Sequence, residues 1–362
     1  MTPNARNISD VLALKPASTP QILNTQGLNL VETFFGQFVN HDKEDTNSLF
    51  GPNDLLYKVP LPYNDPWYVT PDNGRNFVGV RDTQTNLVNG VRQVQSNATS
   101  FFDLSTIYGS DPIIAAALRE YVGGRLLLSN YTTSGGPGTP VVTFTNMLPN
   151  SVQTNINIVP NIFPGVESQA WVSGDLRVNE NIALAYIHWL FHLENNRLAS
   201  QVAAANPTWT DEQIFQKARR LNIAQYQNII AHEYMPDILG EDLMELIPDY
   251  NGYKSNVDAT TTIEFAAAAF RYGHSTVRSY PFLDPLGNSV PIVFPCGIFL
   301  DVFCLNIPAP GLTIITNGMP AAAQLGGLLT APTMTYLAQM PQNIWRGLLN
   351  TRSEKVDSKI DK

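Results

Sequence analysis

Three short stretches, far apart in the sequence, carry side chains that could act together. They hold a glutamine–histidine pair, an arginine–glutamate pair and an arginine–histidine pair: Gln37 and His41, Arg177 and Glu180, Arg271 and His274. An imidazole can take a proton from one peroxide oxygen and return it to the other near neutral pH. A guanidinium stays charged and stabilises the leaving oxygen. A second imidazole can bind haem iron. Each residue alone is more often structural, so their combination carries the prediction.

The other histidines have a weaker claim to chemistry. His188 and His192 stand four residues apart, so on a helix they could share one face as metal ligands. No third ligand follows from local spacing. The zinc-protease pattern fails at His232, because Pro236 stands where its second histidine belongs. A structural role for these three histidines is the favoured interpretation.

Length and composition narrow the class of protein. The chain has 362 residues, 44% of them hydrophobic and 15% charged, which predicts a folded chain with a sizeable core. A net charge of -9 gives no reason to expect nucleic acid or an anionic membrane as partner. No apolar run is long enough for a membrane span, and the stretch 292–305 is broken by Pro295 and Asp301. The first residues lack the apolar core of a signal peptide.

The pattern predicts one mostly α-helical domain over residues 1–362, with long ordered loops. Apolar spacing and capping signals predict helices at 28–41, from Pro112 to about 121, at 179–204, from a capping box at Thr210, and from Thr261 towards His274. Turn-forming residues predict loops at 42–95 and 132–140, and the one strong strand signal is 290–303. The two cysteines, Cys296 and Cys304, fit a disulfide or two buried thiols equally well.

Taken together, the stretches resemble the animal-type haem peroxidases of the peroxidase–cyclooxygenase superfamily. The resemblance covers almost the whole chain, in the order 4–9, 37–42, 99–110, 174–177, 188, 194–199, 206–207, 271–274 and 344–349. It implies a mostly helical fold around a buried haem b. It also implies reduction of hydrogen peroxide with oxidation of a small donor, and an extracellular location.

The resemblance assigns roles to the three stretches. His41 is similar to the distal histidine, Gln37 to the distal glutamine and Arg177 to the catalytic arginine. His274 is similar to the proximal iron ligand, with Arg271 and Glu180 beside the haem.

A calcium site is implied by the same resemblance. Its ligands would be Asp42, Thr99, the Phe101 carbonyl, Asp103 and Ser105. Carboxylate, hydroxyl and carbonyl oxygens are the ligands that calcium prefers. Without the family context, 99–105 would be interpreted as a loop with helix-capping residues.

Departures from the family pattern refine these expectations. Relatives attach haem through an aspartate and a glutamate; here the first position is Asn40 and the second is Glu180, so at most one ester link is expected. A methionine that forms a further link in some relatives is replaced by Asn181. The chain is expected to be shortened at both ends, without the segment that carries an asparagine partner for His274, which would weaken activity.

Two alternatives stay open. The first is a fatty-acid dioxygenase of the same superfamily, which uses a tyrosine three residues before the proximal histidine. Arg271 stands at that position and Tyr272 is one residue closer, which disfavours this alternative. The second is a non-catalytic structural or adhesive protein that keeps the fold.

Overall fold

The structure is a computed structural model. It describes residues 4–13, 20, 22–46, 56–62, 76–81, 85–132, 143–156, 171–289, 292–296, 312–316 and 341–357. Cys304 and most of the predicted strand 290–303 lie outside the described residues, as does most of the predicted loop 132–140, so the question of a disulfide is not addressed by them.

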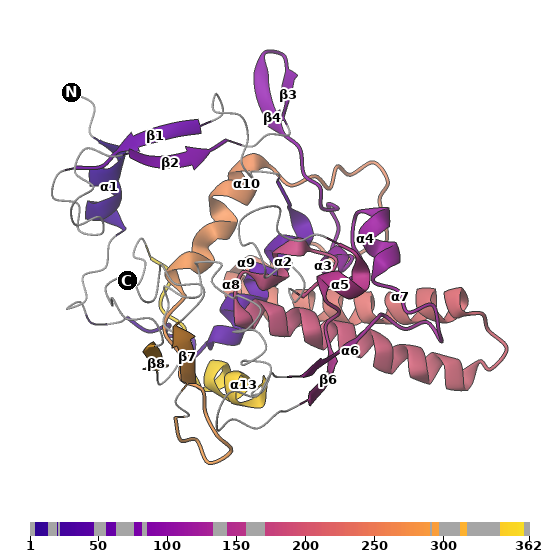
Figure 1. Ribbon diagram of the computed structural model, residues 1–362. Coiled ribbons are helices and arrows are strands. Elements are labelled where there is room, and N and C mark those ends of the chain that lie inside the picture. Colours follow the sequence, from indigo (N-terminus) through magenta and orange to yellow (C-terminus); the bar gives the residue numbers. More distant parts are fainter. Residues whose placement is uncertain are drawn as a thin grey trace.

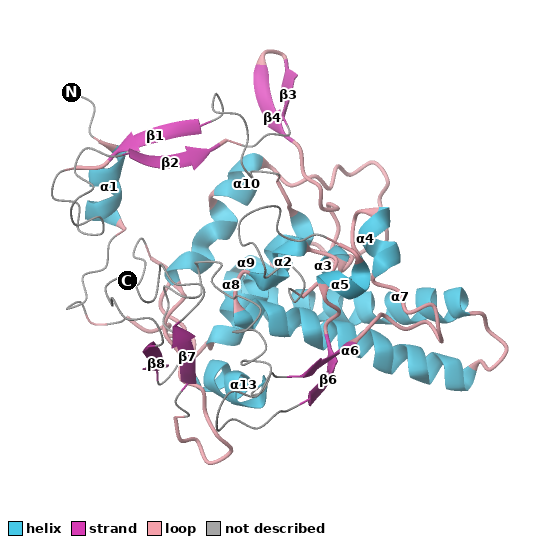
Figure 2. Cartoon of the chain, in the orientation of Figure 1, coloured by secondary structure: helices cyan, strands magenta, loops and turns pink. Residues whose placement is uncertain are grey.

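Helices form the centre of the molecule, which confirms the predicted fold class (Figure 2). α2 (Leu30–Lys43) lies against α6 (Ile182–Ala205), and α6 forms an antiparallel pair with α7 (Asp211–Ile229) (Figure 1). α7 continues into a π-helical turn, η3 (Ile230–Tyr234). The remaining helical elements are α1 (Ala5–Leu12), α3 (Ser105–Tyr108), α4 (Pro112–Ala117), α5 (Ser151–Thr154), η2 (Leu176–Asn179), α8 (Met235–Leu239), α9 (Glu241–Met244), α10 (Ile263–Ala267), η4 (Ala269–Ser275) and α13 (Pro341–Asn350). No described helix is both long enough and apolar enough to span a membrane.

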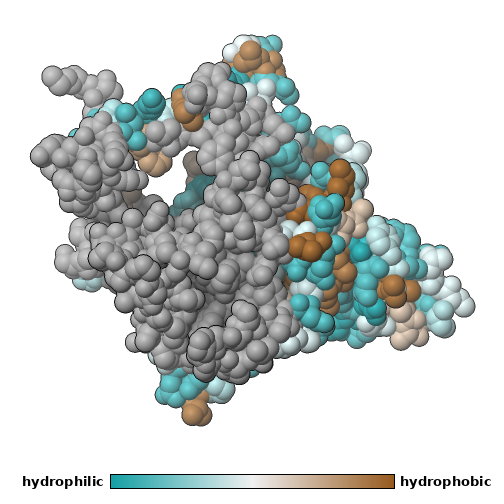
Figure 3. Space-filling model, viewed as in Figure 1, coloured by the Kyte–Doolittle hydropathy of each residue, from teal (hydrophilic) through white to brown (hydrophobic). Residues whose placement is uncertain are grey.

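The strands form two-stranded antiparallel ladders at the periphery. They pair as β1 (Leu56–Pro60) with β2 (Asn76–Val80), β3 (Thr85–Val88) with β4 (Val91–Val94), β5 (Ser129–Thr132) with β6 (Thr143–Met147), and β7 (Ile292–Cys296) with β8 (Leu312–Thr316). The predicted loop region 42–95 therefore also contains paired strands, which the sequence did not locate. Asn89 and Gly90 both have positive φ, the geometry of a tight hairpin turn, and they join β3 to β4. Figure 3 shows hydrophobic side chains at the tip of that hairpin, where Leu87 and Val91 are exposed.

Helix boundaries follow their capping residues. Thr210 and Gln213 form the predicted capping box at the start of α7. α6 ends at Ala205, one residue beyond the predicted end at 204, and Pro207 stands two residues further on. It begins later than predicted, because the side chain of Asn181 accepts a hydrogen bond from the backbone N–H of Leu184 and caps the helix there.

The segment before His274 departs from the predicted continuous helix. Thr262 rather than Thr261 caps α10, and the backbone of Ala268 (φ -129°, ψ -65°) leaves helical geometry. The chain then continues as the 3-10 segment η4, which carries His274. Because a 3-10 helix is tighter than an α-helix, the residues near its end point in directions that a continued α-helix would not give.

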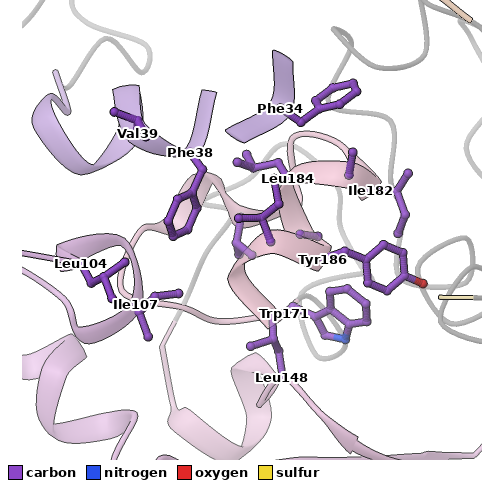
Figure 4. Close-up of a cluster of buried hydrophobic side chains, with 14 of the residues drawn as sticks. Phe34, Phe38, Val39, Leu104, Ile107, Leu148, Trp171, Ile182, Leu184 and Tyr186 are labelled. Carbon is purple, nitrogen blue, oxygen red and sulfur yellow. The ribbon is translucent and has the colours of Figure 1, made fainter. Parts of the chain in front are cut away.

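The hydrophobic core lies where α2 crosses α6 (Figure 4). Phe38 of α2 stacks on Phe191 of α6, with 5.2 Å between ring centroids. Residues 182–188 of α6 are all buried, so the first two turns of the helix are covered on every side. The core fixes the position of α2, which carries Gln37 and His41. It also fixes α6, which begins two residues after Glu180.

A buried polar network ties α6 to its neighbours. Asn195 accepts a hydrogen bond from the hydroxyl of Tyr108 (3.0 Å), and Asn222 of α7 donates to the same hydroxyl (2.9 Å). The side chain of Asn196 accepts a hydrogen bond from the backbone N–H of Leu126 and donates one to the Leu126 carbonyl. Asn195 and Asn196 belong to the stretch 194–199 on which the family resemblance partly rests, and they hold the fold together rather than act in chemistry.

Candidate active site

One cavity of about 530 Å³ brings the three predicted stretches together. Its lining comes from α2, η2, the start of α6, and η4, and it includes all six residues singled out from the sequence: Gln37, His41, Arg177, Glu180, Arg271 and His274. The volume is within the range of about 300–1,000 Å³ that is typical of ligand and cofactor sites. The tertiary structure thus converts three distant pieces of sequence into a single site.

His41 is held as a neutral base. It is 4% exposed, near the end of α2, and its Nε2 lies 3.6 Å from Oε2 of Glu180. Burial lowers the pKa of His41 well below its ordinary value, and the nearby Arg177 lowers it further. At neutral pH the imidazole is therefore unprotonated and free to accept a proton.

Arg177 is anchored by a carboxylate that the sequence analysis missed. Its Nε donates to Oδ1 of Asp175 (3.0 Å), and its Nη2 donates to Asp175 and to the carbonyls of His41 (3.3 Å) and Glu44 (2.7 Å). Burial alone would raise the pKa of Asp175, but the neighbouring Arg177 outweighs it and lowers that pKa to about 2. Burial opposes the charge on Arg177 as well, yet Asp175 keeps the pKa of the guanidinium above its usual value.

The sequence held a signal for this anchor. Asp175 stands two residues before Arg177, and its side chain also accepts the backbone N–H of Arg177 as the cap of η2. An aspartate placed to cap a short helix is thereby placed to hold an arginine in its first turn.

Gly174 explains the close packing behind this pair. A Cβ at Gly174 would collide with the carbonyl of Ser105 and the backbone N–H of Gly109, so only glycine fits. On either side, the Ser173 hydroxyl and the Asp175 N–H both donate to the carbonyl of Thr106 (2.8 and 2.9 Å). The segment that carries Arg177 therefore rests directly on α3.

Gln37 and Glu180 form a polar wall beside His41. The Gln37 amide donates to Oε2 of Glu180 (2.8 Å) and accepts from Asn181 (2.7 Å). Burial raises the pKa of Glu180 above its ordinary value, while Arg177 acts in the opposite direction. Asn181 thus serves twice, as the cap of α6 and as the residue that orients Gln37.

His274 lies on the side of the cavity formed by η4. Its side chain is exposed, and a Cβ built at the adjacent Gly273 would meet no atom within 4 Å, so open space lies next to this backbone. Partial desolvation of the imidazole by its neighbours lowers the pKa of His274, with a further contribution from Arg271. Arg271 is fixed by an ion pair with Glu44 and by a hydrogen bond to Asn40 (3.1 Å). A neutral imidazole beside unobstructed glycine fits an axial ligand next to a flat cofactor.

The predicted cation ligands meet at the end of α2. Asp42 is fully buried and accepts hydrogen bonds from the Ser105 hydroxyl (3.0 Å) and the Leu104 N–H (3.3 Å). Asp103 accepts from the Thr99 hydroxyl (2.9 Å), which also lies 3.4 Å from the Phe101 carbonyl. Burial raises the pKa of Asp42 to about 7, and repulsion from Asp103 adds to the shift. Two facing carboxylates among neutral oxygens fit a hard divalent cation.

His188 and His192 behave as structural residues. Both are fully buried; Nδ1 of His188 lies 2.9 Å from the Leu184 carbonyl, and Nε2 of His192 lies 2.8 Å from the Leu127 carbonyl. In the part of the chain that the structure describes, no three His, Cys, Asp or Glu side chains cluster to hold a metal. The calcium-type loop does not conflict with this finding, since it offers only two carboxylates.

Comparison with known proteins identifies the family of the chain. The family model for animal haem peroxidases matches residues 1–361. The chain belongs to the animal haem peroxidase family. Lactoperoxidase of Mesocricetus auratus is 32% identical over 294 residues, which cover 76% of this chain and 40% of that protein.

Solved structures of a peroxidase and of a fatty acid alpha-dioxygenase have a similar fold. Peroxidase A from Dictyostelium discoideum superposes with a TM-score of 0.75 at 24% identity, covering 100% of this chain and 62% of the other. A fatty acid alpha-dioxygenase of Oryza sativa superposes with a TM-score of 0.60 at 16% identity, covering 95% of this chain and 51% of the other. The chain spans 18 to 40% of the lengths of the first curated relatives that it matches.

Proposed function

We propose that the chain is a haem-dependent peroxidase, which reduces hydrogen peroxide and oxidises a small electron donor outside the cell. The observation that carries this proposal is the single cavity that places a neutral buried His41, a fixed Arg177 and an open-facing His274 together. Family membership supports it. When bound through His274, haem b would supply the iron that cleaves peroxide and stores its oxidising power.

His41 acts as the acid–base group. Since burial keeps the imidazole neutral, it takes the proton from one oxygen of hydrogen peroxide and delivers it to the other, which leaves as water. Gln37, held by Asn181 and Glu180, presents a polar group beside the same space and orients the peroxide.

Arg177 supplies fixed positive charge. Asp175 and two backbone carbonyls hold its guanidinium, so little reorganisation is needed when negative charge develops nearby. Because one of these carbonyls belongs to His41, the base and the charge are positioned by one another.

Calcium has a positioning role in this proposal. Bound between Asp42 and Asp103, it would fix the loop 99–105 to the end of α2, next to His41. The Thr106 carbonyl, one residue beyond that loop, accepts from Ser173 and Asp175. The cation would thereby stabilise both sides of the His41–Arg177 pair.

Glu180 and Arg271 complete the cofactor contacts. Glu180 offers a cavity-facing carboxylate for one ester link, whereas Asn40 has no carboxylate and its side-chain oxygen accepts a hydrogen bond from Arg271. Arg271, three residues before His274, occupies the position at which the dioxygenase alternative requires a tyrosine. This residue favours a peroxidase over a dioxygenase.

Reconstitution with haem tests the proposal. The chain mixed with haem should give a Soret absorption band and should oxidise a guaiacol-type phenol with hydrogen peroxide. A fatty acid in place of peroxide and phenol should give no product. A Soret band without phenol oxidation would instead support the non-catalytic alternative, and the absence of a Soret band would overturn the proposal.

A further inference from the structure

Two hollows of the molecule share a wall. The candidate haem cavity lies on one side, and on the other is a groove of about 830 Å³ between α2, α6, α7, η3 and α13. Tyr272 lines the cavity, whereas Tyr234 and Glu32 line the groove. These three side chains form the wall.

Hydrogen bonds run through this wall without interruption. The Tyr272 hydroxyl donates to Oε1 of Glu32 (3.1 Å), and the hydroxyls of Tyr272 and Tyr234 lie 2.9 Å apart. Since Tyr272 donates to Glu32, its oxygen is free to accept the hydrogen bond from Tyr234. Burial raises the pKa of Glu32 above its ordinary value, although its bond to Tyr272 opposes the shift.

Gly36 makes the passage possible. It lies on α2 one turn after Glu32, and a Cβ there would overlap the Tyr234 hydroxyl. Any other residue at 36 would displace Tyr234 from Tyr272. The backbone of Gly36 is helical, so its conformation would suit any residue. What the position requires is the lack of a side chain, because this leaves room for the contact between the two tyrosines.

The groove has a defined chemistry. Its floor is apolar and aromatic, with Phe35, Phe191 and Trp345 among the lining residues. Four carboxylates border it: Glu32, Glu194, Glu233 and Asp237. Among the described residues that line it there is no lysine, arginine or histidine. Glu194 forms an ion pair with Arg197, whereas the carboxylates of Glu233 and Asp237 are exposed at the groove. The aromatic lining and these negative charges suit a flat aromatic ligand that carries a positive charge.

We propose that the groove is a second donor site, for phenols or aromatic amines that carry a cationic group, and that Tyr234 and Tyr272 relay their electrons to the haem cavity. This inference rests on the proposed peroxidase function. It adds a site at which a donor too large or too charged for the haem cavity is oxidised without reaching it.

Each relay step moves one electron and one proton. Tyr272 gives an electron to the haem that hydrogen peroxide has oxidised, and its hydroxyl proton passes to Glu32. The Tyr234 hydroxyl then transfers its hydrogen atom to the Tyr272 oxygen, and the phenolic O–H of the bound donor restores Tyr234. Glu32 releases its proton to water in the groove. Two donor molecules supply one electron each, and solvent returns the two protons. These two electrons and two protons convert one hydrogen peroxide into two waters.

Binding is tested on the haem-free chain. Equilibrium dialysis with tyramine should show binding, whereas para-hydroxyphenylacetate, a phenol of the opposite charge, should not bind. Leu349→Lys places a cation at the exposed rim of the groove and should abolish tyramine binding. Leu286→Lys, at an exposed position outside the groove, is the matched control and should leave binding unchanged. Equal binding of the two phenols, or tyramine binding that survives Leu349→Lys, would overturn the donor site.

The relay is tested on the haem-loaded chain by electron paramagnetic resonance after rapid mixing with hydrogen peroxide and freezing. A tyrosyl signal should appear, should be lost in Tyr272→Phe, and should no longer be quenched by tyramine in Tyr234→Phe. Tyr280→Phe removes another buried hydroxyl, outside both hollows, and should keep the signal and its quenching. A haem-loaded chain without a tyrosyl signal, or with the signal intact in Tyr272→Phe, would overturn the relay alone. A chain that takes up no haem would overturn the proposed function and the relay with it, while tyramine binding would stand.

Discussion

The two histidine-bearing sides of the cavity are built differently. His41 is buried on a helix of 14 residues that packs against α6, and its backbone carbonyl is held by Arg177. His274 is exposed, on a 3-10 segment of seven residues, and no hydrogen bond joins its imidazole to a described residue. The side that carries His41 is therefore part of the folded core, whereas the side that carries His274, the proposed iron ligand, faces open space. We infer that the first is organised by folding and the second by the cofactor.

The prediction with the largest effect concerns the His274 side of the cavity. His274→Ala should abolish the Soret band of the haem-loaded chain, because a single imidazole carries the axial bond. Absorption spectroscopy during haem titration measures this. The control is His232→Ala, an exposed histidine that lines neither hollow, which should bind haem like the wild type. A wild-type spectrum in His274→Ala would break the comparison, since haem would then be held from the His41 side.

The next prediction separates chemistry from haem binding. His41→Ala should keep the Soret band and slow peroxide cleavage by about 10²-fold or more, the scale for loss of a general base. Stopped-flow absorbance after mixing with hydrogen peroxide measures the rate. If the rate is unchanged, the buried neutral histidine is a structural residue.

Asp175→Asn tests whether the acid–base side is built into the fold. The variant leaves Arg177 without its carboxylate, so the free energy of unfolding should fall by about 3 kcal/mol, the lower end of the scale for breaking a buried pair. Asp45→Asn, whose carboxylate is more exposed and lies 3.8 Å from Arg177, should cost less than about 1 kcal/mol. Urea denaturation measures both, and equal costs would contradict the anchoring role.

The same pair predicts a pH dependence. Because Arg177 lowers the pKa of Asp175 from 3.8 to about 2, the wild type gains stability from the pair above pH 3.8 and loses it as the pH falls towards 2. In Asp175→Asn this loss should be absent.

Calcium binding should strengthen as the pH rises. Since the pKa of Asp42 is about 7, a proton competes for the site, and affinity should rise about tenfold per pH unit up to that value. Without calcium, the stability of the protein changes in the opposite direction. The folded state keeps the Asp42 proton to a higher pH than the unfolded state, so the free energy of unfolding falls as the pH rises from 3.8 to about 7. Calcium titrations at several pH values measure the change in affinity. Asp103→Ala should lose the ion, whereas Asp258→Ala, on the surface, should keep it.

The smallest effect concerns covalent attachment. After peroxide treatment, acid–acetone extraction should release more haem from Glu180→Gln than from the wild type, because Glu180 is the cavity carboxylate placed for an ester. Equal release from both would show that haem is held without that link.

Much of the fold could be predicted from local signals. The capping box at Thr210, the break after Ala205 and the apolar face of α2 depend on residues close in sequence, and each was confirmed. The hairpins within 42–95 were missed, because turn-forming residues also join short strands. The change from α10 to η4 was missed because nothing in the run of alanines marks the residue at which the helix ends.

The sequence by itself determined the family and the types of residue at the site, since a few side chains with the right chemistry recur in a fixed order. Only the tertiary structure decided what holds them. The carbonyls of His41 and Glu44 hold Arg177, Gly36 admits Tyr234 to Tyr272, and Asp42 accepts a hydrogen bond from Ser105, all through contacts across long sequence separations. Burial sets the protonation of His41 and Asp42, and burial depends on how helices pack rather than on neighbouring residues in the chain.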